Sequence, residues 1–306
     1  MSFYLVTGGA GFIGSNIVKE LLKRGEQVRV FDNFSTGKRE NLFPFRENTN
    51  LKVFEGDLRS FHQVRDAVRG IDFVLHQGAL PSVPRSVKDP ITTNDVNVNG
   101  TLNVLEASKE FGVKRFVFAS SSSVYGNSDV LPKVETMPVA PMSPYAITKY
   151  AGERYCQIYY QLYGLETICL RYFNVFGPNQ DPTSQYSAVI PKFIKLIKEG
   201  KRPIVYGDGL QSRDFTYVSN NVEANILACT AQGVAGEIFN IACGERYTLL
   251  DLVNSINFLI GKNVKPIFHE TRPGDIKHSL AGIEKAQTIL GFGVIKKFIE
   301  GLKMII

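Results

Sequence analysis

Short apolar runs alternate with amphipathic stretches through the N-terminal part of the chain. The runs, rich in β-branched and aromatic residues, occupy 2–7, 27–31, 51–56, 71–76, 115–118 and 165–172. Between them, apolar positions recur at helical spacing, as in 15–24 and 95–111. Strands alternating with helices in this way predict a parallel, doubly wound sheet, and therefore an α/β fold of the Rossmann type.

The alternation breaks after Pro178. The pattern there predicts a helix at 189–199, a turn-rich segment at 204–211, a strand at 213–218 and a helix at 221–229, followed by a further segment at 237–242. No internal repeat or low-complexity linker separates these elements. We therefore expect a Rossmann domain of residues 1–174 that also receives 212–240. A smaller, interleaved α+β substrate domain would comprise 175–211 and 241–306.

Composition narrows the class of protein. The 306 residues are 44% hydrophobic and 21% charged, as in ordinary globular proteins, and no apolar run reaches the length of a membrane span. We expect a cytoplasmic protein that does not contact membranes. The net charge of +6 is scattered, which favours a polyanionic small molecule such as a nucleotide diphosphate over nucleic acid. The four cysteines lack CxxC spacing and nearby histidines, so we expect buried thiols and no metal site.

The first apolar run ends in a glycine-rich turn. Gly8, Gly11 and Gly14 follow the predicted strand 2–7 and open a helix, and the next strand ends at Asp32. Such glycines permit a tight turn, close approach of the backbone to a pyrophosphate and close helix packing. A carboxylate about 20 residues beyond the turn accepts from ribose hydroxyls and repels a 2′-phosphate. The pattern predicts dinucleotide binding, with NAD favoured over NADP.

Later strand ends extend this cofactor site. Asp57 and Leu58 follow the third strand and are candidates for the adenine edge, and the fourth strand leads into Gln77-Gly78-Ala79-Leu80, where the middle of the cofactor should lie. His62 and His76 lie in or beside regular elements, and we interpret both as structural residues.

The segment 120–149 carries the candidate chemistry. Four serines, 120–123, follow the strand 115–118, and Ser143-Pro144 precedes a helix in which Tyr145 and Lys149 share one face. An ammonium beside a phenol stabilises the phenolate and lowers its pKa. Tyr145 is therefore predicted to be a general base that takes a proton from a substrate hydroxyl.

The same helix has an unusually aromatic surface. Tyr150, Tyr155, Tyr159 and Tyr163 accompany Ile158 and Leu162, which is more apolar surface than packing on one sheet would bury. We expect a homodimer formed through the helix after Pro144 and the helix at 95–111.

Several motifs in one order resemble the extended short-chain dehydrogenase/reductase family, and within it the NAD-dependent nucleotide-sugar 4-epimerases. They are the glycine turn, the serine strand end, Tyr145/Lys149, Arg171-Tyr172-Phe173-Asn174, Arg213-Asp214-Phe215 and Arg272-Pro273-Gly274-Asp275. Segments 82–86, 131–135 and 277–280 are most similar to the group that acts on UDP-N-acetylglucosamine. The resemblance spans nearly the whole chain.

The resemblance implies a mechanism. Tyr145 takes the proton of the sugar O4 while C4 gives a hydride to tightly bound NAD. The 4-keto sugar then rotates about its phosphate linkage, and the hydride returns to its other face. Lys149 lowers the pKa of Tyr145 and holds the nicotinamide ribose, and Ser121 hydrogen-bonds O4. Asn174, Arg213 and Arg272 match diphosphate contacts, and Asp275 matches a uridine-ribose contact.

The resemblance also implies two sets of binding residues. The expected NAD contacts are Gly8, Gly11, Phe12, Ile13, Gly14, Asp32, Asn33, Ser35, Thr36, Gly37, Asp57, Leu58, Gln77, Ala79, Leu80, Asn97, Ser120, Tyr145, Lys149, Tyr172 and Val175. The expected substrate contacts are Ser82, Val83, Ser121, Ser122, Ser123, Tyr145, Asn174, Ala188, Val189, Lys192, Val205, Tyr206, Arg213, Arg272, Asp275 and Ser279.

Two positions discriminate among activities. Related 4,6-dehydratases carry an acidic pair where this chain has Ser122 and Ser123, and related uronic acid decarboxylases keep a glutamate in that segment, so elimination is disfavoured. Ser279 matches a residue that walls the sugar pocket, where a small side chain admits an N-acetyl group. The alternatives are an epimerase of UDP-glucose or of a uronic or muramic derivative, a net 4-keto reductase, and a non-catalytic NAD-binding protein.

Overall fold

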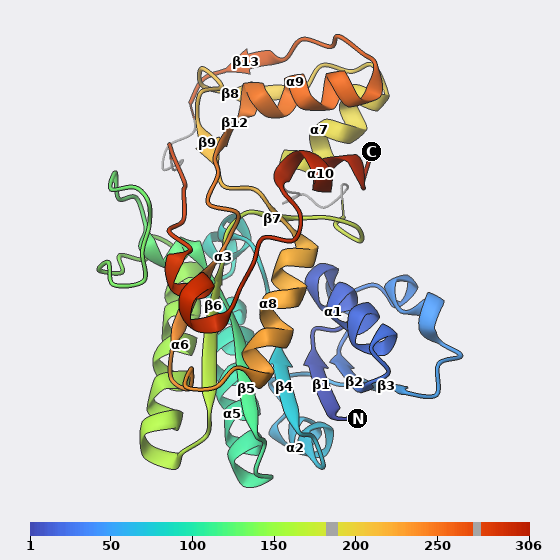
Figure 1. Ribbon diagram of the computed structural model, residues 1–306, viewed down its shortest axis with the longest axis vertical. Helices are drawn as coiled ribbons and strands as arrows, with labels where there is room; N and C mark the ends of the chain where they lie inside the picture. Colours follow the sequence, from blue (N-terminus) through green and yellow to red (C-terminus); the bar gives the residue numbers. More distant parts are fainter. Residues whose placement is uncertain (182–188, 272–276) are drawn as a thin grey trace.

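The computed structural model describes residues 1–181, 189–271 and 277–306 (Figure 1). Seven strands in the described residues form one parallel sheet in the order β11-β6-β5-β4-β1-β2-β3. They are β1 Phe3–Thr7, β2 Gln27–Asp32, β3 Leu51–Glu55, β4 Phe73–His76, β5 Arg115–Ser121, β6 Thr167–Tyr172 and β11 Ile238–Ile241. The order reverses between β1 and β4, which confirms the predicted Rossmann-type sheet.

Helices cover both faces of this sheet. Alternate residues of β1 point to opposite sides, so Tyr4 and Val6 pack in one cluster and Leu5 in another. The first cluster includes apolar side chains of α1 (Phe12–Lys23) and α8 (Val218–Thr230); the second includes those of α2 (Phe61–Val68), α5 (Gly100–Glu110) and α6 (Pro144–Tyr163). The sheet is therefore doubly wound, as its unbroken apolar strands require.

Several helical segments differ from the predicted boundaries. The helix expected at 95–111 begins as a π-helical segment, Asp95–Asn99, and continues as α5. The expected strand at 213–218 is two short strands, β9 (Ser212–Arg213) and β10 (Thr216–Tyr217), because the chain changes partner between them. Further short helices are α3 Val83–Lys88, α4 Pro90–Asn94 and the 3₁₀ turns Arg39–Asn41, Phe43–Phe45 and Ser122–Tyr125.

A second, smaller part lies beyond the carboxyl ends of the main strands (Figure 1). It holds α7 (Val189–Lys198), α9 (Leu249–Ile260) and α10 (Phe298–Lys303), whereas a π-helical turn at Ala286–Leu290 packs on the sheet part, against β11 and α8. Three two-stranded sheets tie it together: β7 (Val175–Phe176) with β10, β8 (Ile204–Tyr206) with β13 (Ile267–His269), and β9 with β12 (Tyr247–Thr248).

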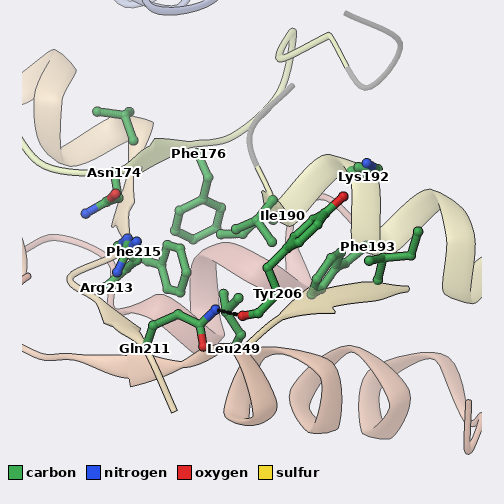
Figure 2. Close-up of a pocket in the computed structure, with 13 residues that line it drawn as sticks. Asn174, Phe176, Ile190, Lys192, Phe193, Tyr206, Gln211, Arg213, Phe215 and Leu249 are labelled. Atoms are coloured by element: carbon green, nitrogen blue, oxygen red, sulfur yellow. Dashed lines mark hydrogen bonds between the residues drawn. The ribbon is translucent and has the colours of Figure 1, made fainter. Parts of the chain in front are cut away.

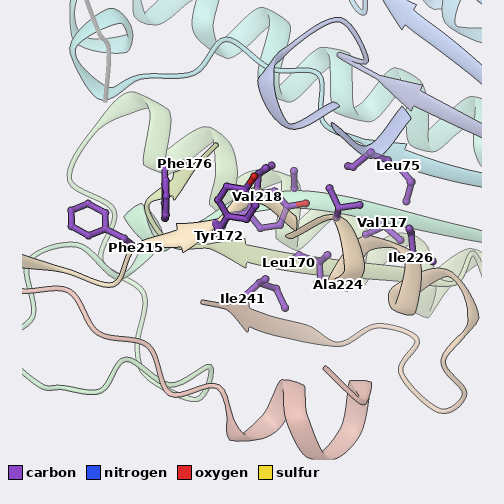
Figure 3. Packing of buried hydrophobic residues seen from close by; sticks show 14 of the residues in the cluster. Leu75, Val117, Leu170, Tyr172, Phe176, Phe215, Val218, Ala224, Ile226 and Ile241 are labelled. Carbon is purple, nitrogen blue, oxygen red and sulfur yellow. The ribbon is translucent and has the colours of Figure 1, made fainter. Parts of the chain in front are cut away.

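The two parts share one continuous core. Figure 3 shows Leu75, Val117 and Leu170 of the sheet facing Ile226 of α8, and the same cluster reaches Phe176 and Phe215 beneath the second part. Phe193 of α7 and Phe298 of α10 belong to it as well. This continuity holds the second part against the edge of the sheet where parallel strands end, which is the place where α/β folds bind ligands.

Candidate active site

A long cleft of about 770 Å³ runs along the carboxyl ends of β1, β2, β4 and β5. The glycine turn is its floor. Gly8 has φ +65°, a conformation that L side chains rarely adopt, and a Cβ on Gly14 would lie 2.2 Å from the carbonyl oxygen of Gly8. Glycine is therefore required at both positions, and the backbone amides at the start of α1 are left accessible to an anionic group.

Asp32 lies at the end of β2, on the rim of the same cleft. Its Oδ2 accepts from the amide of Ala10 at 2.9 Å and its Oδ1 from the amide of Phe34 at 2.8 Å. Burial raises the pKa of this carboxyl above its ordinary value, while the two amides lower it. The carboxylate is thus held rigidly where the predicted ribose contact requires it.

Tyr145 and Lys149 line this cleft, and Ser121 lies beside Tyr145. β5 ends at Ser121, α6 begins at Pro144, and Ser143 caps α6 by accepting from the amide of Ala146 at 3.2 Å. The hydroxyl of Ser121 lies close enough to the phenol of Tyr145 to lower its pKa. The Lys149 ammonium lies 5.9 Å from the centre of the Tyr145 ring and donates to the carbonyl of Ala119 at 2.8 Å. The structure thus brings together the three side chains that the sequence predicts to be catalytic.

The electrostatics of this trio differ from the prediction. Lys149 is expected to lower the pKa of Tyr145, yet burial raises it, opposed only by the hydrogen bond with Ser121. The physical reason is that desolvation disfavours the phenolate, while the ammonium is directed to Ala119 rather than to the phenol oxygen. Burial also lowers the pKa of Lys149 to about 8, partly offset by Cys156 and Glu153.

A buried ion pair stands behind the trio. Glu153, two turns beyond Tyr145 on the same face of α6, is fully buried and accepts from Arg171 of β6 through two bonds of 2.8 Å. Its Oε1 also accepts from the hydroxyl of Ser120 at 2.5 Å. The pair therefore anchors the end of β5 to α6, and sequence reasoning missed it because nothing local to Glu153 marks its partner.

A second cavity of about 330 Å³ lies between β7, α7, β8 and β9 (Figure 2). Tyr206 and Phe193 supply aromatic walls, and the polar groups of Asn174 and Arg213 lie together at one side. Arg213 is half-buried and donates to the carbonyls of Ser212 at 2.9 Å and Lys277 at 3.3 Å. A cavity with flat apolar walls and a guanidinium suits an aromatic base joined to a phosphate group.

The sequence of this chain matches a known protein family. The model of the NAD dependent epimerase/dehydratase family matches residues 4–242. The chain belongs to this family. A putative UDP-glucose 4-epimerase of Methanocaldococcus jannaschii is 38% identical over 99% of this chain and 96% of its own length.

Two solved structures of family members are similar to this chain. UDP-N-acetylglucosamine 4-epimerase from Methanobrevibacter ruminantium, in complex with UDP-N-acetylmuramic acid, has a TM-score of 0.95 at 40% identity, with 99% of this chain and 96% of that one covered. UDP-glucose 4-epimerase of Thermus thermophilus, in complex with NAD, has a TM-score of 0.88 at 38% identity, with 99% and 97% covered. NAD is therefore the cofactor of this family member.

The cleft contains most of the residues predicted to contact NAD. Of those, Asn97 and Val175 do not line it. Asn97 is buried and holds Leu80 instead, accepting from its amide at 2.7 Å and donating to its carbonyl at 3.2 Å. Val175 lines the second cavity. Sequence reasoning missed cleft residues on two loops, after β2 and after β7: Phe34, Lys38, Asn41, Asn179, Gln180 and Asp181.

The predicted substrate residues are spread over both cavities. The second cavity is lined by Asn174, Val189, Lys192, Tyr206 and Arg213, and the first by Ser82 and Tyr145. Neither lining includes Val83, Ser121, Ser122, Ser123, Val205 or Ser279. Ala188, Arg272 and Asp275 lie outside the described residues. The sequence did not single out the apolar walls Phe176, Ile190, Phe193, Phe215 and Leu249, because buried apolar side chains look alike in sequence.

His76 is structural, as predicted. Its ring is fully buried between Thr7 and Thr101, whose Oγ1 atoms lie 2.7 and 3.0 Å from Nδ1 and Nε2, and burial and Lys149 lower its pKa to about 3. His62 is an exposed side chain on α2 that lies 3.6 Å from Asp66. All four cysteines are buried thiols, as expected. None of the helices in the described segments is long and apolar enough to cross a bilayer.

Proposed function

We propose that this protein reversibly inverts C4 of a UDP-hexose, and that its substrates are UDP-N-acetylglucosamine and UDP-N-acetylgalactosamine. The observation that carries the proposal is that Tyr145 and Lys149 line the NAD cleft, with the hydroxyl of Ser121 beside the phenol of Tyr145. The relatives named above support UDP-sugar 4-epimerisation as the reaction, without regard to which sugar is the substrate.

The residues of the trio divide the proton chemistry. Tyr145 and Ser121 hold the proton of the sugar O4 between two hydroxyls and pass it as the C4 alcohol becomes a ketone and reverts. Lys149 keeps a positive charge beside them, and its bond to Ala119 fixes its position. NAD, when bound, supplies the hydride chemistry at C4. Ser122 and Ser123 offer no carboxylate for eliminating water, and the buried hydroxyl of Ser123 has no hydrogen-bond partner among the described residues.

The second cavity is the proposed UDP site. Tyr206 and Phe193 would flank the uracil. Asn174 and Arg213 would contact the diphosphate, and Lys192 would lie at the outer edge of the cavity. The sugar would then extend towards Tyr145 in the neighbouring cleft. In this proposal the sheet part binds NAD and the second part binds the UDP group of the substrate, so each of the two proposed domains has its own ligand.

The N-acetyl preference rests on Ser279. Its side chain is small, and the residue is 9% exposed in a segment that packs along β9. Ser279 lines neither cavity, so its role as a wall comes from the family resemblance, and a small side chain there would leave room at C2 of the sugar. UDP-glucose is a second candidate substrate, because a roomy pocket rejects a smaller ligand weakly. Muramic and uronic derivatives are further candidates, since the Methanobrevibacter neighbour was solved with UDP-N-acetylmuramic acid.

The test is proton NMR of the purified protein with UDP-N-acetylglucosamine and no added NAD. Appearance of the galacto anomeric signal is the expected result, and Tyr145→Phe, which removes only one hydroxyl, should abolish it. Conversion of UDP-glucose alone would keep the reaction and refute the N-acetyl preference. Release of stoichiometric NADH with a 4-keto product would instead show a net oxidation, which is the reverse direction of a 4-keto reductase. A full rate with Tyr145→Phe would exclude this residue as the proton carrier.

A further inference from the structure

Three candidate substrate residues converge on one short piece of chain, Ser212-Arg213-Asp214, called here the 212–214 segment. It comprises β9 and the residue after it, and it lies beside Asn174 and Phe215 at one wall of the second cavity (Figure 2). Asp214 is completely buried, although it neighbours a half-buried arginine. A fully buried carboxylate needs a specific set of partners.

The partners of Asp214 are three backbone amides from two distant segments. Oδ1 accepts from Cys243 at 3.0 Å, and Oδ2 accepts from Gly244 at 3.1 Å and Ala281 at 3.2 Å. Burial raises the pKa of this carboxyl to about 6 while the three amides lower it, so the group is ionised at neutral pH. An ionised carboxylate only accepts, and it therefore matches three donors.

Ser212 binds the segment that carries Ser279. Its amide donates to the carbonyl of Lys277 at 3.0 Å, its carbonyl accepts from the amide of Ser279 at 3.0 Å, and its hydroxyl lies 2.9 Å from Nδ1 of His278. The guanidinium of Arg213 donates to the carbonyl of the same Lys277. Residues 277–281 are thus bonded along the whole 212–214 segment.

Asn174 is held by the backbone of Asp214. Its Nδ2 donates to the carbonyl of Asp214 at 3.3 Å, and its own carbonyl accepts from the amide of Thr216 at 3.2 Å. Asn174 has φ +33°, a conformation that is uncommon for a side-chain-bearing residue and that these bonds maintain. Asn174, Arg213 and Ser279 are therefore fixed relative to one another through Asp214 and Ser212.

We propose that Asp214 is a positioning residue for the substrate: its buried carboxylate locks the sugar-wall segment 277–281 against the strand that carries Arg213. The distance between the diphosphate contacts and the sugar wall is then set by one side chain that touches neither group of the substrate. This inference rests on the proposed function, because the roles of Arg213 and Ser279 come from it.

The test is Asp214→Asn, which keeps the shape but replaces an acceptor by an NH₂ group that faces amide donors. We expect KM for the UDP-hexose that the wild type converts to rise at least about tenfold, with kcat changed by less than about threefold and bound NAD per chain unchanged. The preference between N-acetylated and plain sugars should also shift. Asp72→Asn is the matched control, because Asp72 likewise accepts a backbone amide, from Phe3 at 2.8 Å, in the loop before β4.

Calorimetric titration with UDP separates this inference from the proposed function. If the wild type turns over no UDP-hexose, the proposed function fails, and weaker UDP binding by Asp214→Asn still supports the positioning role. Unchanged KM and UDP affinity in the folded variant would overturn it. Should Asp214→Asn fail to fold, Asp214→Ser keeps a small acceptor that cannot bond all three amides, and an unchanged KM there would overturn the proposal.

Discussion

At the scale of single residues, Lys149 shows how catalysis opposes stability. It is 5% exposed, and burial lowers its pKa to about 8 from an ordinary 10.5. Below pH 8 the folded protein therefore holds a cation that water would solvate better, at a cost on the order of 3 kcal/mol. Glu153 offsets part of this cost but does not abolish it.

Lys149→Met is expected to lose turnover by at least about a thousandfold and to gain on the order of 1–3 kcal/mol of folding free energy at pH 7. Because the folded pKa lies below the unfolded one, wild-type stability rises as pH rises from about 8 towards 10.5, so the gain should shrink over that range. Chemical denaturation at pH 7 and 9.5 measures it. Lys114→Met, which removes an exposed lysine, is the control. A gain independent of pH would contradict the linkage.

Ser279 is the residue through which substrate preference is most directly changed. Ser279→Tyr should lower kcat/KM for UDP-N-acetylglucosamine at least about tenfold more than for UDP-glucose, because the phenol ring would occupy the space assigned to the acetyl group. Competition between the two sugars in one reaction gives the ratio directly. Ser279→Ala is the matched control, since it keeps the wall small. Equal losses on both sugars would remove Ser279 as the wall.

At the scale of elements, the loop after β7 crosses to the loop after β2 and the start of α1. Asp181 pairs with Lys38 at 2.8 Å, Asn179 donates to the hydroxyl of Ser15 at 3.0 Å, and Asn16 donates to the carbonyl of Pro178 at 3.0 Å. Asp181, Asn179 and Lys38 line the NAD cleft. The loop after β7 is therefore placed to slow the departure of a bound cofactor.

Lys38→Ala is expected to speed NAD loss only about two- to fivefold, since both members of the Lys38–Asp181 pair are partly exposed and such pairs are weak. Adding Asn179→Ala to this variant removes the uncharged hydrogen bond to Ser15 and should speed NAD loss by a similar factor. Arg46→Ala is the control, because it breaks an exposed ion pair away from the cleft and should leave the rate of NAD loss unchanged. An enzymatic assay of the NAD released during dialysis measures the rate. Loss equal to wild type in the double variant would show that the loop does not retain NAD.

The elements also show what sequence reasoning reaches. The glycine turn, Asp32 and the Tyr145/Lys149 face were predictable because their requirements are local: a positive φ, a strand end, a four-residue helical spacing. Asp214 and Glu153 were not, because their partners lie 29 to 67 and 18 to 33 residues away along the chain, and only the fold brings them together. The prediction that the pKa of Tyr145 is lowered was wrong for the same reason, since the burial that raises this pKa depends on the assembled cleft.

At the scale of the whole molecule, α6 has two unlike faces. Tyr145, Lys149 and Glu153 point into the protein, while the opposite stripe exposes Ile147 (54%), Ile158 (37%) and Leu162 (69%). These three residues recur at helical spacing, and Tyr163, 53% exposed, follows them at the end of the helix. We propose that this stripe, with the helical segments that pack beside it, forms the interface of a homodimer, because a contiguous apolar helix face of this kind marks an association site.

A dimer built on α6 would buttress the helix that carries the catalytic tyrosine and lysine, so assembly and activity should be linked. Leu162→Glu combined with Ile158→Glu is expected to convert a dimer into a monomer, because each buried interface would hold two pairs of unpaired carboxylates. Light scattering after size exclusion measures the mass. Phe258→Glu is the matched control, since Phe258 is 85% exposed on α9, away from the stripe. A monomeric wild type at micromolar concentration, or dissociation by Phe258→Glu alone, would refute the interface.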